Sequence, residues 1–308
     1  MGRTIIFVHG RDFKPARSAL WPLWMNALRH GLERDHPGHM RKFDKAIKQF
    51  VYFGDISNQF LRSTGKTYDE KKDVASRRQT LDDLRQYSRH QFNKRTYNKL
   101  PGKDAFKEFL ADAGSILTSP IGLTELLITT VAEDLREYWN FDSEFGSMVR
   151  GRMSDPLKQA MNRNDKILVV SHSLGTMIAY DTFWKFSHTS EYRTRYSSKE
   201  IDLWLTLGSP LADNTVQRKL KGARADGLRR YPHNVKRWIN FAAEDDYISH
   251  DSTVGNDFRK MQTLRPPTRI EDRKIYNLAV RSDKSNPHHG CGYLVHPAVV
   301  KIVTDWLG

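Results

Sequence analysis

The sequence contains little cysteine and no long uninterrupted apolar run. Its 308 residues include one cysteine, Cys291, which excludes an intramolecular disulfide and a site built from several thiolates. The apolar segment 111–132 is interrupted by Gly, Pro and Glu residues, so its apolar stretches are too short to span a membrane. The chain enters a strand-like segment at once, without the basic and apolar regions of a signal peptide. We therefore expect a cytoplasmic protein with no transmembrane segment.

Acidic residues are scarce relative to basic ones. The chain has 50 Lys and Arg against 36 Asp and Glu, a net charge of +14. Half of this excess lies in residues 62–107, where 13 basic residues accompany 6 acidic ones. That segment has no zinc-finger, RRM or KH pattern, so a solvated helical excursion is favoured and no nucleic-acid partner is expected. Peripheral contact of the basic segment with an anionic surface stays open.

Strand-length apolar runs alternate with amphipathic helical segments, which predicts an α/β fold with a mostly parallel sheet covered by helices on both faces. Six strands are expected, at residues 4–9, 50–53, 167–171, 201–207, 235–242 and 275–280. Helices are expected at residues 18–34, 142–164 and 297–307. Residues 56–140 are too long for a simple connection. We expect them to form a helical cap or lid inserted into a core made of residues 1–55 and 141–308.

Ser173 lies between an apolar strand and a helical segment, in the run Ser171-His172-Ser173-Leu174-Gly175. A nucleophile elbow is so tight that the residues two before and two after its serine must be small, as Ser171 and Gly175 are. The turn exposes the serine hydroxyl, and the N–H groups at the start of the following helix point toward any oxyanion that forms. The pattern predicts Ser173 as a nucleophile and the Leu174 N–H as an oxyanion donor.

A second oxyanion donor must come from the end of another strand. The first strand ends in His9-Gly10-Arg11, and the turn after it can present the N–H of Arg11. On its own a His-Gly pair indicates only a turn. Together with the elbow it predicts an oxyanion hole formed by Arg11 and Leu174.

The acid of a triad is expected downstream of the serine, in the chain order Ser, Asp, His. The run Glu244-Asp245-Asp246 directly follows the strand expected at 235–242. Asp246 is preferred because Ile248 can anchor its loop, and Asp245 is the alternate. A solvated acidic turn is the competing interpretation.

The base is expected in the loop before the last helix, which contains His288, His289 and Cys291. Flanking glycines would let a histidine move between the serine and the leaving group. His289 is preferred, and His288 is the alternate. The two histidines and the cysteine could suggest a metal, but no second ligand cluster completes such a site, so none is expected.

These motifs, together with Leu207-Gly208-Ser209-Pro210, resemble the α/β-hydrolase superfamily, in particular its serine esterase and lipase-like members. The elbow departs from the family pattern because it opens with Ser171 where most members have glycine. The chain also lacks the two leading strands of larger members, which implies a compact six-stranded core.

The resemblance implies that Ser173 attacks an ester carbonyl while His289 takes its proton and Asp246 orients the imidazole. Arg11 and Leu174 would hold the oxyanion, and water would release the acyl group without any cofactor. The implied substrate is a small-molecule or lipid-like ester. Thioesterases, acyltransferases and peptidases use the same groups, and a hydrolase fold acting only as a binding protein is a further alternative.

Overall fold

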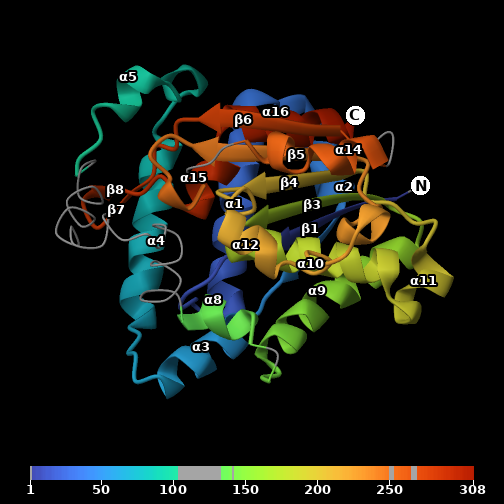
Figure 1. The fold of residues 1–308 in the computed structure, drawn as a ribbon. Coiled ribbons are helices and arrows are strands. Elements are labelled where there is room, and N and C mark those ends of the chain that lie inside the picture. The colour runs from blue at the N-terminus through green and yellow to red at the C-terminus, as the bar shows by residue number, and fades with distance from the viewer. Residues whose placement is uncertain (1, 103–132, 141, 250–252, 265–268) are drawn as a thin grey trace.

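The computed structural model describes residues 2–102, 133–140, 142–249, 253–264 and 269–308. They form an α/β fold in which a six-stranded sheet has helices on both faces (Figure 1). The expectation of a mostly parallel six-stranded sheet covered by helices is confirmed.

The strand order in the sheet is β2-β1-β3-β4-β5-β6, and every neighbouring pair is parallel. The strands are β1 (Arg3–Val8), β2 (Ile47–Val51), β3 (Lys166–His172), β4 (Leu203–Leu207), β5 (Arg237–Ala243) and β6 (Arg269–Ile275). A separate antiparallel hairpin consists of β7 (Val280–Arg281) and β8 (Lys284–Ser285). Because β1 and β3 are neighbours in the centre of the sheet, the turns after their carboxyl ends meet.

The described helices follow the chain in this order: α1 (Arg17–Asp35), α2 (Met40–Lys45), α3 (Gly54–Ser63), α4 (Glu70–Arg85), α5 (Lys94–Tyr97), α8 (Glu133–Tyr138), α9 (Phe145–Asn162), α10 (Leu174–His188), α11 (Ser190–Tyr196), α12 (Asn214–Lys219), α13 (Val254–Asp257), α14 (Arg259–Leu264), α15 (Gly290–Leu294) and α16 (Pro297–Leu307). Short 3-10 turns lie at η1 (Pro37–His39), η2 (Arg89–Gln91), η3 (Gly227–Arg230) and η4 (Tyr247–Ser249).

The sheet separates two apolar cores. In β1, Ile6 and Val8 face the core formed with α9 and α10, whereas Ile5 and Phe7 face the core formed with α1 and α16. This alternation follows from the two-residue period of a strand. Strands buried on both faces need apolar residues at every position, which explains why the central strands were visible as continuous apolar runs.

The sixth strand is not where the sequence predicted it. It spans Arg269–Ile275, and the expected range 275–280 is wrong, because it covers only the last residue of β6, the loop that follows and the first residue of β7. Within β6 only Ile275 is buried. An edge strand pairs on one side alone and often carries charged side chains, so this strand lacks the apolar pattern by which the others were found.

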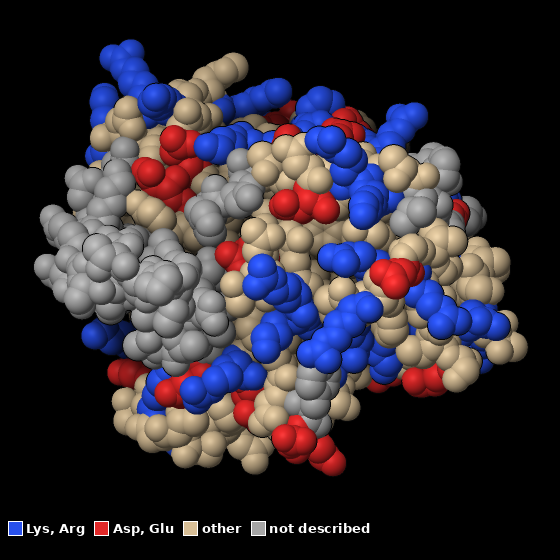
Figure 2. Space-filling model, viewed as in Figure 1, with Lys and Arg blue, Asp and Glu red and all other residues tan. Residues whose placement is uncertain are grey.

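The region between β2 and α9 contains α3, α4, α5 and α8 in its described part, and α4 packs against α1, α15 and β7. The apolar segment 111–132 falls in residues 103–132, outside the described residues. Among the helices of the described ranges, none is both long and apolar enough to cross a membrane. On the face seen in Figure 2, Lys and Arg side chains are spread widely and are interspersed with Asp and Glu.

Candidate active site

Ser173 forms the turn between β3 and α10. Its backbone has φ 54° and ψ −128°, a conformation that costs an ordinary residue energy and persists only when its surroundings enforce it. Those surroundings include a hydrogen bond from the Ser173 N–H to the Leu207 carbonyl, 3.1 Å long. The tight strand-turn-helix geometry expected for an elbow is therefore present at this serine.

Small residues make this turn fit against β1. A Cβ atom added to Gly175 would lie 2.4 Å from the His9 carbonyl oxygen, and one added to Gly10 would lie 2.7 Å from the Ser173 Cβ. Both distances are far below van der Waals contact. Ser171 is also buried, and its Oγ accepts a 2.8 Å hydrogen bond from Trp204 Nε1. The close approach of Gly10 brings the turn after β1 directly beside Ser173.

Both expected oxyanion donors lie at this junction. Leu174 is the first residue of α10, so its N–H has no carbonyl to reach within the helix. Arg11 follows Gly10 in the turn that passes Ser173, and its side-chain Nε donates to Asp134 at 2.8 Å. The Arg11 guanidinium therefore turns toward α8, and Arg11 is one of the residues that line the cavity containing Ser173.

The turn after β1 is fastened from outside the sheet. The fully buried Asp134 of α8 accepts hydrogen bonds from Arg11 Nε and from the Asp12 N–H, the latter at 2.7 Å. Lys14 Nζ donates to the carbonyl oxygens of Arg11, Asp12 and Phe13. Asn58 of α3 exchanges two hydrogen bonds with the main chain of Lys14, of 2.9 and 2.7 Å. The region between β2 and α9 thus fixes this turn.

Asp246 pairs with His288. The Asp246 side chain is buried, and both of its oxygens lie 3.0 Å from His288 Nδ1. It also accepts hydrogen bonds from the Tyr293 hydroxyl at 2.6 Å and from the Ile248 N–H at 3.1 Å. Burial alone would raise the pKa of Asp246, but the charge and hydrogen bond of His288 outweigh it and lower the pKa to about 2. The carboxylate therefore stays ionised.

The preferred base of the sequence analysis does not contact this carboxylate. His289 is buried, and neither of its ring nitrogens has a hydrogen-bond partner among the described residues. The adjacent residue, His288, which lies in the turn before α15, occupies the position expected for His289. The structure thus brings together Ser173, Asp246 and the alternate His288 rather than the preferred His289.

The alternate acid also lies elsewhere. Asp245 has a positive φ of 58°, and its Oδ2 accepts a 3.0 Å hydrogen bond from the Tyr97 hydroxyl of α5. Asp246 therefore faces the histidine, as the sequence analysis preferred. Ile248 contributes to this geometry through its N–H, which anchors the Asp246 loop.

His172, the residue before the serine, supports the loop that carries His288. Its Nε2 hydrogen-bonds to the His288 carbonyl oxygen at 2.8 Å, and the two imidazole rings lie 4.6 Å apart. Burial is the main cause that lowers the pKa of His172 to about 3. The ring is therefore neutral, and its Nε2–H is the donor to the carbonyl.

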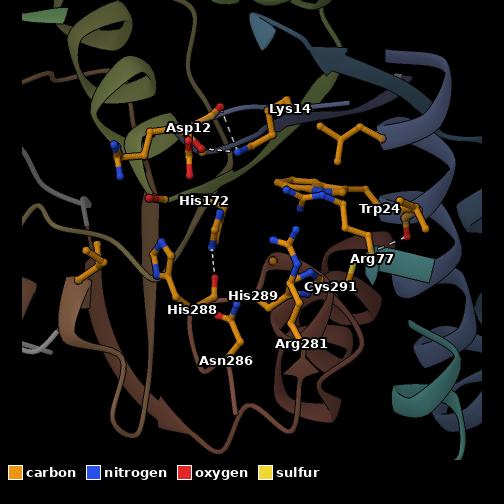
Figure 3. A pocket seen from close by; sticks show the side chains of 17 residues that line it. Asp12, Lys14, Trp24, Arg77, His172, Arg281, Asn286, His288, His289 and Cys291 are labelled. Atoms are coloured by element: carbon orange, nitrogen blue, oxygen red, sulfur yellow. Dashed lines mark hydrogen bonds between the residues drawn. The ribbon is translucent and has the colours of Figure 1, made fainter. Parts of the chain in front are cut away.

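Ser173 and His288 open into one cavity of about 190 Å³. One wall is apolar and comes from Leu20, Leu23 and Trp24 of α1. Figure 3 shows His288 on one side of this cavity and Arg77 and Trp24 on the other, with His172 between them. The cavity is thus polar and basic around much of its lining and apolar along α1.

Sequence reasoning missed several residues of this site. Lys14, Arg77 and Arg281 all line the cavity, and Asp134 anchors the turn after β1. Lys14 lies five residues after His9 and follows the predicted oxyanion turn, a position that could have drawn attention to it. Arg77 is far from every motif, and Arg281 lies seven residues before His288, but no sequence signal connects either arginine to Ser173.

No family model matches the chain, and searches of curated proteins and of solved structures find no similar protein.

In the part of the chain that the structure describes, no group of three or more His, Cys, Asp or Glu side chains is arranged to hold a metal ion.

Proposed function

We propose that the chain is a serine hydrolase of the α/β-hydrolase type that cleaves carboxylic esters through an acyl-enzyme intermediate. The observation that carries this proposal is the convergence of three features on one cavity: the strained Ser173 turn, the buried Asp246–His288 pair and the junction of Gly10 with Ser173. A serine, an imidazole and a buried carboxylate in this relation form the standard apparatus of acyl transfer.

In the first half of the reaction the Ser173 oxygen forms a bond to the ester carbonyl carbon. Its proton passes to Nε2 of His288, since Nδ1 of that ring faces Asp246. The carbonyl oxygen becomes an oxyanion, which the N–H groups of Arg11 and Leu174 are suited to hold. The carbon–oxygen bond to the alcohol then breaks, and the alcohol leaves with the proton from His288.

In the second half water attacks the acyl-Ser173 carbonyl. His288 takes a proton from that water and returns it to the Ser173 oxygen as the acid leaves. Asp246 remains ionised throughout and stabilises the imidazolium that forms in each half. Its hydrogen bonds from Tyr293 and Ile248 hold it in place for this role.

We also infer that the region between β2 and α9 acts as a cap. Two contacts support this inference. Arg77 of α4 lines the cavity, and Asp134 of α8 holds the turn that carries Arg11. In the α/β-hydrolase proposal the cap would therefore both wall the site and fix one of its oxyanion donors.

A fluorophosphonate probe tests the proposed function directly. We expect the wild type to be labelled on Ser173, identified by mass spectrometry of the modified peptide. The Ser173→Ala variant should not be labelled, and its hydrolysis of p-nitrophenyl acetate should fall by about 10⁴-fold or more. Ser173 is buried, and alanine removes its hydroxyl alone while keeping its Cβ, so the melting temperature should change little.

Ser187→Ala is the matched control. Ser187 is a buried serine on the same helix, α10, and its Oγ donates to the Phe183 carbonyl at 2.9 Å. It should be labelled and should hydrolyse the ester like the wild type. Failure of the probe to modify the wild type, or activity of Ser173→Ala within about tenfold of it, would reject the proposal.

A further inference from the structure

Two arginines on the far side of the cavity share a single carboxylate. Arg77 Nε lies 2.9 Å from Asp73 Oδ2, and Arg281 Nη2 hydrogen-bonds to Asp73 Oδ1. The side chain of Arg77 is 13% exposed, that of Arg281 is 28% exposed and that of Asp73 is 7% exposed. Two largely buried guanidinium groups therefore pair with one carboxylate, so one positive charge in this cluster is not compensated. Such a charge is costly to keep away from water unless an anion pairs with it.

Both arginines retain donors for a ligand. Arg77 uses Nε for Asp73, and within the described residues neither of its Nη groups donates a hydrogen bond. Arg281 donates from Nε to Ser76 Oγ at 3.2 Å and from Nη2 to Asp73. The planar fork of a guanidinium matches the oxygen pair of a carboxylate or phosphate. Figure 3 shows both side chains reaching into the cavity.

His289 is a second and independent sign of a ligand. The side chain lines the same cavity, is only 5% exposed and has no hydrogen-bond partner at either nitrogen among the described residues. Burial, and then the charge of Arg77, lowers its pKa well below the usual value, so the ring is neutral and carries one N–H donor. A buried donor without a partner destabilises a fold, and a ligand oxygen would satisfy it.

The size of the cavity limits what such a ligand can be. Its volume of about 190 Å³ is below the range of roughly 300–1,000 Å³ that drug-sized ligands occupy. Trp24 and Leu23 supply an apolar wall suited to a short carbon chain. The part of the ligand that lies inside the cavity must therefore be short.

We propose that the substrate is a small ester carrying a carboxylate or phosphate group, which Arg77, Arg281 and His289 bind while Ser173 attacks the ester carbonyl. This inference depends on the proposed esterase function and replaces the lipid-like ester of the sequence analysis with a short, anionic one. The role of the three residues is to bind and orient the substrate, and they take no part in bond making.

Three ethyl esters of matched length test the proposal. Monoethyl glutarate carries a carboxylate at the end of its acyl chain, ethyl pentanoate ends in a methyl group, and ethyl 4-aminobutanoate carries an ammonium. We expect kcat/KM for the glutarate ester to exceed that for ethyl pentanoate by about 10- to 100-fold, the usual worth of a hydrogen bond to a charged group. The ammonium ester should be the poorest. Ethyl 4-phosphonobutanoate in a parallel assay distinguishes a phosphate site from a carboxylate site.

Variants then assign the preference to the arginines. In Arg77→Gln and Arg281→Gln, kcat/KM should fall far more for monoethyl glutarate than for ethyl pentanoate. Arg77→Lys keeps the charge and should retain part of the preference. Arg85→Gln is the matched control, because Arg85 lies on the same helix and pairs with Asp82 outside the cavity. It should keep the wild-type preference.

Binding of glutarate, measured by calorimetry, separates this inference from the proposed function. If no ester is hydrolysed but glutarate binds to the wild type and to Arg85→Gln and not to Arg77→Gln, the esterase proposal fails and the anion site stands. The anion site is wrong if kcat/KM for ethyl pentanoate equals that for monoethyl glutarate. It is also wrong if the folded Arg77→Gln/Arg281→Gln variant keeps the preference for monoethyl glutarate.

Discussion

The cavity has two halves that are built in different ways. The strand-end half consists of Ser173, Asp246 and His288, and the arginine half consists of Arg77 and Arg281 with Asp73 and His289. In the strand-end half, turns directly after β3 and β5 supply the serine and the carboxylate. In the arginine half, Asp73 and Arg77 come from α4, Arg281 comes from the small β7–β8 hairpin, and His289 directly precedes α15, all outside the six-stranded sheet.

The difference shows how a fold can separate chemistry from recognition. Parallel strands bring the ends of distant segments to one edge, where a fixed set of reactive groups can assemble. Segments outside the sheet can change their side chains without disturbing that set. If this division holds, damage to the strand-end half should reduce turnover for every ester, whereas damage to the arginine half should affect anionic esters alone.

The neighbouring histidines give the largest expected contrast. His288→Gln removes the only proton carrier in the proposed mechanism, so we expect kcat for p-nitrophenyl acetate to fall by about 10³- to 10⁴-fold. His289→Gln leaves the Asp246–His288 pair intact and should lower kcat by less than about tenfold. Steady-state kinetics on the two purified variants, with melting curves to confirm folding, measures both effects. The reverse order would restore His289 as the base.

Gly208 allows the strand-end half to be displaced without removing any of its groups. It has φ 55°, and a Cβ atom there would lie 2.8 Å from Asp246 Oδ2 and 2.9 Å from His288 Nδ1. The Gly208→Ala variant should therefore push the pair apart. A displacement of about 1 Å in a catalytic group can cost on the order of 10²-fold, and we expect kcat/KM for neutral and anionic esters to fall together by that amount.

Gly227→Ala is the control for backbone strain. Gly227 has a similar φ of 57°, but a Cβ atom there would meet nothing within 4 Å. Both variants carry the cost of a left-handed conformation in an L-residue, roughly 1–2 kcal/mol, so both should lose a few degrees of melting temperature. Only Gly208→Ala should lose activity. Equal activity in the two would mean that the contact with Asp246 and His288 does not matter for turnover.

Most of the fold could be predicted from the sequence because the central strands are buried on both faces. Continuous apolar runs such as 167–171 indicate buried strands of a parallel sheet when helical segments alternate with them. The edge strand β6 was missed for the opposite reason, since Glu271, Asp272 and Arg273 give it a polar sequence. Burial leaves a pattern in the sequence, and backbone pairing at an exposed edge does not.

The same reasoning explains which site residues were predictable. Ser173 and Asp246 lie directly after strands, where local spacing constrains their positions. The choice between His288 and His289 depends on loop torsions that spacing does not determine, and the preference for His289 did not match the geometry. Arg77 and Arg281 meet only through tertiary packing around Asp73, so no local pattern could have paired them.

The smallest expected effect concerns Lys14, which lies between the two halves. Its ammonium contacts the carbonyl oxygens of Arg11, Asp12 and Phe13. Burial, followed by the positive charge of Arg77, lowers the pKa of Lys14 to about 7, although Asp12, Asp134 and Asp73 partly oppose that shift. Lys14 is thus charged below this pH and neutral above it. The positive charge of the cavity should fall as the pH rises through 7.

If the arginine half binds an anion, this loss of charge should weaken the binding of an anionic ester and leave a neutral one unaffected. The carboxylate of monoethyl glutarate is ionised from about pH 6 to about pH 8.5, so its own charge does not change. Titration of groups that act on Ser173 affects both esters alike, so its effect cancels in the ratio of their KM values. We expect the KM of monoethyl glutarate relative to that of ethyl pentanoate to rise about threefold across that range. In Lys14→Met the ratio should not change with pH. A ratio that is already constant in the wild type would mean that Lys14 only fastens the turn after β1 and contributes no charge to recognition.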